Sequence, residues 1–266
     1  MTDMRTVIVT GGTFGLGREM SLGLAQKGHR VVAAGIDSKQ VSSTADGSVS
    51  AFRREVEDSG LRTIEVVETD VSDADQVDEL ARDAITRYDR VDALVNNAAI
   101  GPLGTVLDTE EALFEQVLAV NLKGPFLTSK SFIPHFAERG GGSIINVGSG
   151  AGWGKPNMSA YGASKGGLAT LTTSMAYDFF HDRIRVNLLI PGGGGIAGGI
   201  SFGRVGEGGS LVAATGSVAG RPVNGYDMAE TVDFLIGESG TTISGSVIDL
   251  GCFANQGGRI QEKGNE

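Results

Sequence analysis

Short runs of β-branched residues alternate along this chain with longer segments whose apolar residues recur with a helical period. Such alternation predicts βαβ units, and therefore a parallel sheet with helices on both faces. With 266 residues, 40% of them hydrophobic, the chain can bury one large core. We expect a single α/β domain over 1–266, a doubly wound parallel sheet of about seven strands.

Five segments carry the helical signal, and seven carry the strand signal. The expected helices cover 17–28, 49–59, 73–88, 110–137 and 158–180. The expected strands cover 6–10, 30–34, 63–70, 91–98, 143–149, 184–191 and 244–251. No composition break marks a second domain, and no repeat of solenoid period is present.

Charge and composition exclude several classes of protein. The net charge is −10 and no basic run occurs, so a nucleic-acid surface is not expected. The single cysteine, Cys252, cannot form an internal disulfide. The histidines, His29, His135 and His181, lack metal-ligand spacing, so we expect no metal.

The N-terminus and the hydropathy pattern favour a cytoplasmic protein. The opening MTDMRTVIVTGG has an acid where a signal peptide carries positive charge, and it reaches glycine before an apolar core develops. No stretch offers the roughly 18 unbroken apolar residues that span a membrane. We therefore expect no membrane partner and a location in the cytoplasm.

One segment departs from the regular alternation. Residues 191–210 contain ten glycines, a composition that disfavours a stable helix. A surface linker is one interpretation. Because loops at the carboxyl ends of strands close over ligands in α/β enzymes, we favour a flexible substrate loop over about 191–222.

A glycine-rich turn follows the first expected strand directly and opens the first expected helix. The segment TGGTFGLG has the spacing T-G-x-x-x-G-x-G, with Gly11, Gly15 and Gly17. Glycines in this place allow the backbone to approach a pyrophosphate, while the helix N-terminus supplies free N–H groups. The turn therefore predicts a dinucleotide site.

The segment YGASK places Tyr161 and Lys165 four positions apart in an expected helix. Residues at this spacing lie on one face, so the amine can sit beside the phenol. A free tyrosine has a pKa near 10, and a neighbouring positive charge lowers it toward the working pH of a general acid/base. Taken alone, such a pair also occurs by chance on many helices.

The order of these motifs along almost the whole chain resembles the classical short-chain dehydrogenases/reductases. Besides the glycine turn and YGASK, the resemblance includes NNAA at 96–99 and PG at 191–192. Three further positions match the family pattern: Asp70, Asn121 and Ser149. The resemblance implies a Rossmann-type fold and hydride transfer between a secondary alcohol or ketone and a nicotinamide dinucleotide.

The resemblance also implies the catalytic roles. Tyr161 would be the general acid/base, Lys165 would lower its pKa and bind the nicotinamide ribose, and Ser149 would orient the substrate oxygen. Asn121 would hold a water that relays protons from Lys165. Other interpretations stay open for single residues: Ser149 as a turn residue, Asn121 as a buried polar group and Asp70 as a helix cap.

A larger set of residues is expected to contact the dinucleotide. It comprises Gly11, Thr13, Phe14, Gly15, Leu16, Gly17, Asp37, Asp70, Val71, Asn97, Ala98, Tyr161, Lys165, Pro191, Gly192 and Ile196. Relatives that prefer NAD usually carry an acid where Gly35 stands, and Asp37 lies two residues on. Relatives that prefer NADP carry a basic residue at the places of Phe14 or Ile36. The sequence therefore favours NAD(H) without excluding NADP(H).

Several positions depart from the family pattern. Ala99 replaces a glycine, Ile196 stands where a threonine often contacts the carboxamide, and Cys252 stands in a usually bare segment. Ile196 and the glycine-rich loop suggest an alternative function, a dinucleotide-binding regulatory or scaffold protein with impaired catalysis. Trp153 is interpreted either as lining the substrate pocket or as core.

Partners are expected to be few. The substrate is a small alcohol or carbonyl compound, its identity unspecified. In relatives the helices corresponding to 110–137 and 158–180 pair subunits, so the resemblance implies a homo-oligomer, a tetramer or dimer.

Overall fold

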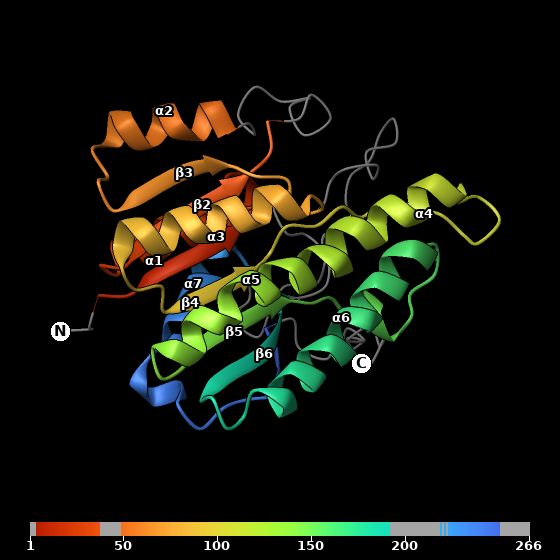
Figure 1. Cartoon of the computed structure of the whole chain (residues 1–266). Helices are drawn as coiled ribbons and strands as arrows, with labels where there is room; N and C mark the ends of the chain where they lie inside the picture. Colours follow the sequence, from red (N-terminus) through yellow and green to blue (C-terminus); the bar gives the residue numbers. More distant parts are fainter. Residues whose placement is uncertain (1–3, 38–48, 192–218, 220, 222, 251–266) are drawn as a thin grey trace, which may run out of the picture.

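A computed structural model describes residues 4–37, 49–191, 219, 221 and 223–250. Seven parallel strands form one sheet in the order β3-β2-β1-β4-β5-β6-β7 (Figure 1). The strands are β1 (Thr6–Thr10), β2 (Arg30–Gly35), β3 (Ile64–Glu68), β4 (Ala93–Asn96), β5 (Gly142–Val147), β6 (Ile184–Ile190) and β7 (Val247–Asp249). Each corresponds to an expected strand, and the parallel sheet is confirmed.

The helices lie in two layers that cover the two faces of the sheet. They are α1 (Gly15–Gln26), α2 (Val49–Ser59), α3 (Ala74–Tyr88), α4 (Glu111–Leu118), α5 (Gly124–Glu138), α6 (Ser159–Asp178) and α7 (Gly225–Ile236). Shorter elements are η1 (Ala119–Lys123), η2 (Gly150–Trp153) and η3 (Glu238–Gly240). Figure 1 shows α3, α5 and α6 along one face.

Alternation along the strands builds two separate cores. Val7 and Val9 of β1 point to one face, where they pack with residues of α1, α2 and α7. Ile8, between them, points to the other face and packs with α3, α5 and α6. On that second face Phe132 and Phe136 stack with their ring centroids 6.2 Å apart.

The segment expected to be one long helix over 110–137 is interrupted. Helices α4 and α5 are joined by η1, a single π-helical turn that carries Asn121. A π-turn inserts an extra residue into the helix and often marks a functional position. The expectation of continuous α-helix is therefore wrong at this turn.

Helix α7 was not anticipated from the sequence. It begins with a capping box: the Asn224 side chain accepts from the Asp227 N–H, and the Asp227 carboxylate accepts from the Asn224 N–H. Its buried residues Met228 and Val232 pack in the same core as α1. Gly23 of α1 allows this approach, since a Cβ there would lie 2.7 Å from the Ala229 methyl.

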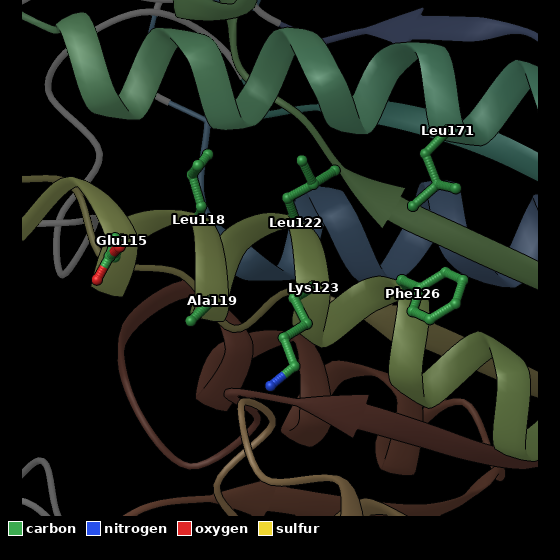
Figure 2. A pocket seen from close by; sticks show the side chains of 7 residues that line it. All are labelled: Glu115, Leu118, Ala119, Leu122, Lys123, Phe126 and Leu171. Carbon is green, nitrogen blue, oxygen red and sulfur yellow. The ribbon is translucent and has the colours of Figure 1, made fainter.

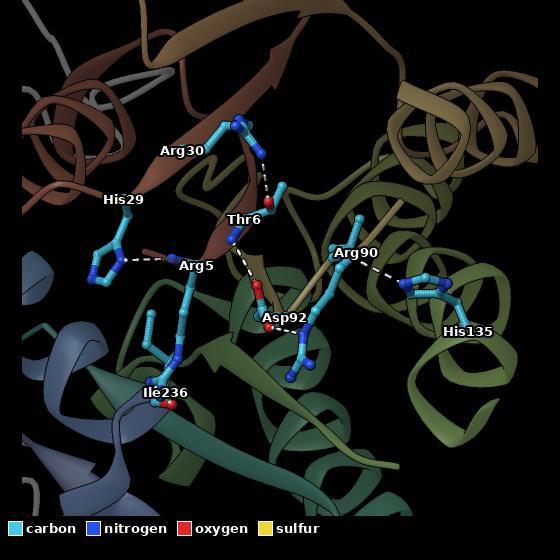
Figure 3. Close-up of polar contacts among 9 residues, drawn as sticks. Arg5, Thr6, His29, Arg30, Arg90, Asp92, His135 and Ile236 are labelled. Carbon is cyan, nitrogen blue, oxygen red and sulfur yellow. Dashed lines mark hydrogen bonds and ion pairs between the residues drawn. The ribbon is translucent and has the colours of Figure 1, made fainter. Parts of the chain in front are cut away.

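Polar contacts hold together the amino-terminal edge of the sheet (Figure 3). Asp92 accepts from the Thr6 N–H at 2.8 Å, and His135 Nε2 accepts from the Val91 N–H at 3.1 Å. His29 Nδ1 accepts from the Arg5 N–H, so Nε2 carries the proton and donates to Asp233 at 2.8 Å. Two of the three histidines therefore have structural partners.

Among the described residues no group of His, Cys, Asp and Glu is arranged to hold a metal ion. No helix in the described part of the chain is long and apolar enough to cross a membrane.

Candidate active site

The candidate site residues gather at the carboxyl ends of the strands. The glycine-rich turn follows β1, Asn97 follows β4, Ser149 follows β5 and Pro191 follows β6. Between β1 and β4 the strand order reverses direction, and in open parallel sheets ligands bind at such a switch point. The fold therefore brings residues from distant parts of the sequence to one edge of the sheet.

The backbone path of the glycine-rich turn depends on the absence of side chains at its glycines. A Cβ at Gly17 would lie 2.0 Å from the Gly11 carbonyl oxygen, and one at Gly11 would lie 2.8 Å from the Ala98 Cα. Gly11 and Gly15 have positive φ angles of 61° and 51°, which favour glycine. The backbone can follow this path only with the glycines that the sequence supplies.

The N-terminus of α1 is uncapped. Phe14 is the N-cap residue, and no side chain accepts a hydrogen bond from the first turn. No acidic residue lies in that turn to offset the helix dipole. Free N–H groups at a positive dipole end favour an anion, so a pyrophosphate fits this turn.

Asn97 supports the glycine-rich turn from the neighbouring strand end. Its side-chain amide donates to the carbonyls of Thr10 and Gly11 at 3.0 and 3.1 Å. The Thr10 hydroxyl accepts from the N–H groups of Asn97 and Ala98 at 3.1 and 3.2 Å. Thr10 is the first residue of the T-G-x-x-x-G-x-G motif, but the motif does not show that its hydroxyl connects the turn to the end of β4.

Tyr161 and Lys165 share one face of α6, and both are buried. The Lys165 amine lies 5.8 Å from the centre of the Tyr161 ring and donates to the Val147 carbonyl at 2.7 Å. Burial lowers the pKa of Lys165 to about 7. The lysine therefore changes charge near neutral pH, a property typical of functional sites.

Ser149 stands at the start of η2 in an extended conformation. Its hydroxyl oxygen accepts from the Ala151 N–H at 3.2 Å, so it does serve as a turn residue. That bond uses a lone pair and leaves the O–H hydrogen able to donate. The two interpretations of Ser149 are therefore compatible.

The Asn121 side-chain amide donates both of its hydrogens to protein groups and accepts one hydrogen bond. Its Oδ1 accepts from the Ile100 N–H at 2.9 Å, and its Nδ2 donates to the Ile100 carbonyl at 2.8 Å and to the Ser164 hydroxyl at 3.0 Å. Asn121 is therefore a satisfied buried polar group, but its partners are Ile100 and the Ser164 hydroxyl and not the helix carbonyls that this interpretation expected. Because both Nδ2 hydrogens are in use, a relay water could contact this side chain only at the second lone pair of Oδ1.

The structure excludes the interpretation of Asp70 as a helix cap and the interpretation of Trp153 as a core residue. Asp70 forms a local turn by accepting from the N–H and hydroxyl of Ser72, whereas the cap of α3 is Asp73. Trp153 is 46% exposed, which excludes the core interpretation. Trp153 is the last residue of η2. The preceding residue, Gly152, packs closely on α6, since a Cβ at Gly152 would lie 3.0 Å from the Lys165 carbonyl oxygen.

The remaining expected dinucleotide contacts divide into two groups. Thr13 and Val71 are buried near the strand ends, and Asp37 is exposed just beyond β2. Gly192 and Ile196 lie outside the described residues, as does Cys252, together with most of the expected loop 191–222.

Comparison with known proteins agrees with this geometry. A family model described as short chain dehydrogenase matches residues 5–195. An uncharacterized oxidoreductase of Thermotoga maritima is 34% identical over 71% of each chain. The 3-oxoacyl-[acyl-carrier-protein] reductase FabG of the same organism is 32% identical, over 71% of this chain and 73% of the relative.

Solved structures extend the similarity beyond the matched sequence. The 3-ketoacyl-(acyl-carrier-protein) reductase of Brucella melitensis, solved in complex with NADH, has a TM-score of 0.76 and 26% identity. That alignment covers 97% of this chain and 98% of the other. By its sequence match and its fold, the chain belongs to the short-chain dehydrogenase family, a family of oxidoreductases.

Proposed function

We propose that this protein is a nicotinamide-dependent oxidoreductase that interconverts a secondary alcohol and a ketone, with Tyr161 as general acid/base. The observation that carries the proposal is the buried Tyr161–Lys165 pair on α6, at the sheet edge where the glycine-rich turn offers a pyrophosphate cradle. The bound nicotinamide would accept or supply the hydride. The chain's own residues would handle the proton and the substrate's orientation.

The proposed proton chemistry assigns one task to each side chain. In alcohol oxidation the Tyr161 oxygen takes the proton of the substrate hydroxyl as the carbon loses hydride; in the reverse direction it returns the proton to the carbonyl oxygen. The Ser149 hydroxyl donates to that same oxygen and stabilises its developing charge. Lys165, with a pKa near 7, supplies positive charge beside the phenol and can pass protons onward.

The dinucleotide would be held by the uncapped first turn of α1, with Asp70 and Val71 beside β3 and with Lys165 on the nicotinamide ribose. NAD(H) is the dinucleotide we favour, because Asp37 is acidic and neither Phe14 nor Ile36 is basic. A carboxylate there repels a 2′-phosphate and can accept from a 2′-hydroxyl.

We further propose that the protein is a homo-oligomer, paired through α5 and α6. An open apolar hollow of about 470 Å³ lies on this side of the molecule, and neither Ser149 nor Tyr161 lines it (Figure 2). Its lining residues are Glu115, Leu118, Ala119, Leu122, Lys123, Phe126 and Leu171. Half-exposed Phe126 is the kind of side chain that a second copy would cover.

A substrate screen tests the proposed activity. Purified protein is incubated with a panel of secondary alcohols and ketones, each with NAD and NADP in parallel, and the nicotinamide absorbance is followed. We expect turnover with at least one substrate class. Dinucleotide binding without any turnover would contradict the proposed chemistry and favour the regulatory alternative.

A further inference from the structure

The end of β2 lies against the glycine-rich turn, and the contact between them leaves no space for a side chain at position 35. The Gly12 N–H donates to the Ala34 carbonyl at 2.9 Å. A Cβ at Gly35 would lie 2.2 Å from the Thr13 hydroxyl oxygen, and Thr13 is only 3% exposed. Because Thr13 is buried, an acidic residue at position 35 would require the turn to rearrange.

Two residues further on, the chain supplies the carboxylate that position 35 cannot. Asp37 is exposed, and the Ser50 hydroxyl in the first turn of α2 donates to its Oδ2. The bond fixes a carboxylate near the turn that would hold the pyrophosphate. Ser50 itself is only partly exposed, which limits the hydroxyl's freedom.

Two arginines of α1 and α2, Arg18 and Arg53, have partners of their own. Arg18 of α1 forms a two-point ion pair with Glu55 and lies over the Phe52 ring at 5.8 Å. Arg53 donates to the Val66 carbonyl at 3.1 Å. Each of these guanidinium groups therefore has a described partner other than Asp37.

We propose that Ser50 is a positioning residue for dinucleotide selection: it holds the Asp37 carboxylate where it accepts from the 2′-hydroxyl of an adenosine ribose and repels a 2′-phosphate. Because Thr13 packs on Gly35, the carboxylate that recognises the 2′-hydroxyl is at position 37 and not at position 35. The inference rests on the proposed dinucleotide-dependent function, and it adds a residue that contacts no ligand itself.

Direct binding measurements test this inference without relying on turnover. Dissociation constants for NAD⁺ and NADP⁺ are measured by calorimetry for the wild type and for Ser50→Ala, Ser50→Thr and Asp37→Asn. The matched control is Ser59→Ala, which removes a hydroxyl bonded to the Val56 carbonyl at the far end of the same helix. Thermal unfolding of each variant reports any structural loss.

The wild type should bind NAD⁺ more tightly than NADP⁺. Ser50→Ala should weaken NAD⁺ binding by about three- to tenfold, the loss expected for one ordinary hydrogen bond at an exposed position, and should leave NADP⁺ binding unchanged or tighter. Ser50→Thr should restore the preference. Asp37→Asn should reduce the preference at least as much, and Ser59→Ala should leave it intact.

Different outcomes overturn different statements. If the wild type binds NAD⁺ and Ser50→Ala keeps the NAD⁺/NADP⁺ ratio, then Ser50 has no positioning role. A wild-type preference for NADP⁺ would overturn the assignment of Asp37 as well. Absence of binding by either dinucleotide would instead overturn the proposed function on which the inference rests.

Discussion

Lys165 is the residue whose environment most sharply separates a functional role from a structural one. A buried amine with one carbonyl partner is costly, since desolvation disfavours its charged form. A chain selected for stability alone would place an apolar residue there. The cost is understandable if the charge is used when a dinucleotide and substrate are present.

This cost makes a prediction about stability and pH. The folded-state pKa of Lys165, about 7, lies below the unfolded value of 10.5, so the unfolded chain binds more protons between those pH values. Stability contributed by this residue should therefore rise as pH increases from 7 toward 10, by several kcal/mol at most, given about 1.4 kcal/mol per pKa unit.

The measurement is chemical denaturation of the dinucleotide-free protein at pH 7 and pH 9.5, for the wild type and Lys165→Met. The variant should be the more stable protein at pH 7, and the difference should shrink at pH 9.5. Comparison with the variant removes the contribution of other titrating groups. A difference independent of pH would contradict the shifted pKa.

The Asn121 side chain connects the π-turn η1 to the segment after β4 and to α6. Three hydrogen bonds connect it to Ile100 and Ser164, and two of them satisfy the backbone of the segment after β4. Asn121→Ala should destabilise the protein by about 2–4 kcal/mol, because buried backbone groups lose their partners. Denaturant unfolding measures the change.

The comparison variant is Ser164→Ala, which removes one of the three bonds together with the bond from the Ser164 hydroxyl to the Tyr161 carbonyl, and should cost about 1–2 kcal/mol. Equal losses for the two variants would show that the amide does not hold the Ile100 backbone. A loss below about 0.5 kcal/mol for Asn121→Ala would show that the π-turn is maintained by other contacts.

The turn between β1 and α1 can be tested as an element by adding one methyl group. Gly17→Ala would place a carbon 2.0 Å from the Gly11 carbonyl oxygen, so the turn must open and the cradle must change shape. Dinucleotide affinity should fall by at least tenfold. Gly28→Ala is the control, because its φ of 90° makes it destabilising while no atom lies within 4 Å.

Both glycine variants should unfold at lower denaturant concentration, but only Gly17→Ala should lose affinity for the dinucleotide. If the two variants bind equally well, the turn is not where the pyrophosphate lies.

The sequence predicted the elements with strong periodic signals and missed those that depend on tertiary contacts. All seven strands and the helices over 49–59 and 73–88 follow from β-branched runs and apolar spacing. Helix α7 begins at a glycine and packs on α1, and the helical period of its apolar residues from Met228 to Ile236 was a signal that the prediction did not include. Its capping pair, Asn224 and Asp227, was another readable sign.

The sequence predicted which residues form the candidate site, but it did not predict which residues contact one another there. Motif order named Ser149, Tyr161 and Lys165, and the structure places Tyr161 and Lys165 on one helix face and Ser149 at the end of β5. Motif order could not show that Asn97 braces the glycine-rich turn, that Thr13 packs on Gly35 or that Trp153 is exposed. Those facts arise from segments that meet only in the folded chain.

At the scale of the whole molecule, the chain presents an apolar side where α5 and α6 meet solvent. If a second copy covers this side, Phe126→Glu should place a charge in the interface and shift the protein toward the monomer. Light scattering coupled to size exclusion measures the mass. Met4→Glu, at an exposed apolar residue near the amino-terminal edge, is the control and should not change it.

An oligomer unaffected by Phe126→Glu would contradict this placement of the interface, and a monomeric wild type would contradict the assembly itself. Neither result would bear on the chemistry, because the hollow is lined by none of the proposed catalytic residues.

The central claim is that Tyr161 transfers the proton in a dinucleotide-dependent reaction, and Tyr161→Phe tests it most directly. With a substrate that the wild type turns over, kcat and the dinucleotide dissociation constant are measured for both proteins. Loss of the single oxygen should reduce kcat by at least about a hundredfold, within the range typical of general acid/base catalysis, with dinucleotide affinity changed less than about threefold. A variant that retains wild-type kcat would contradict the account.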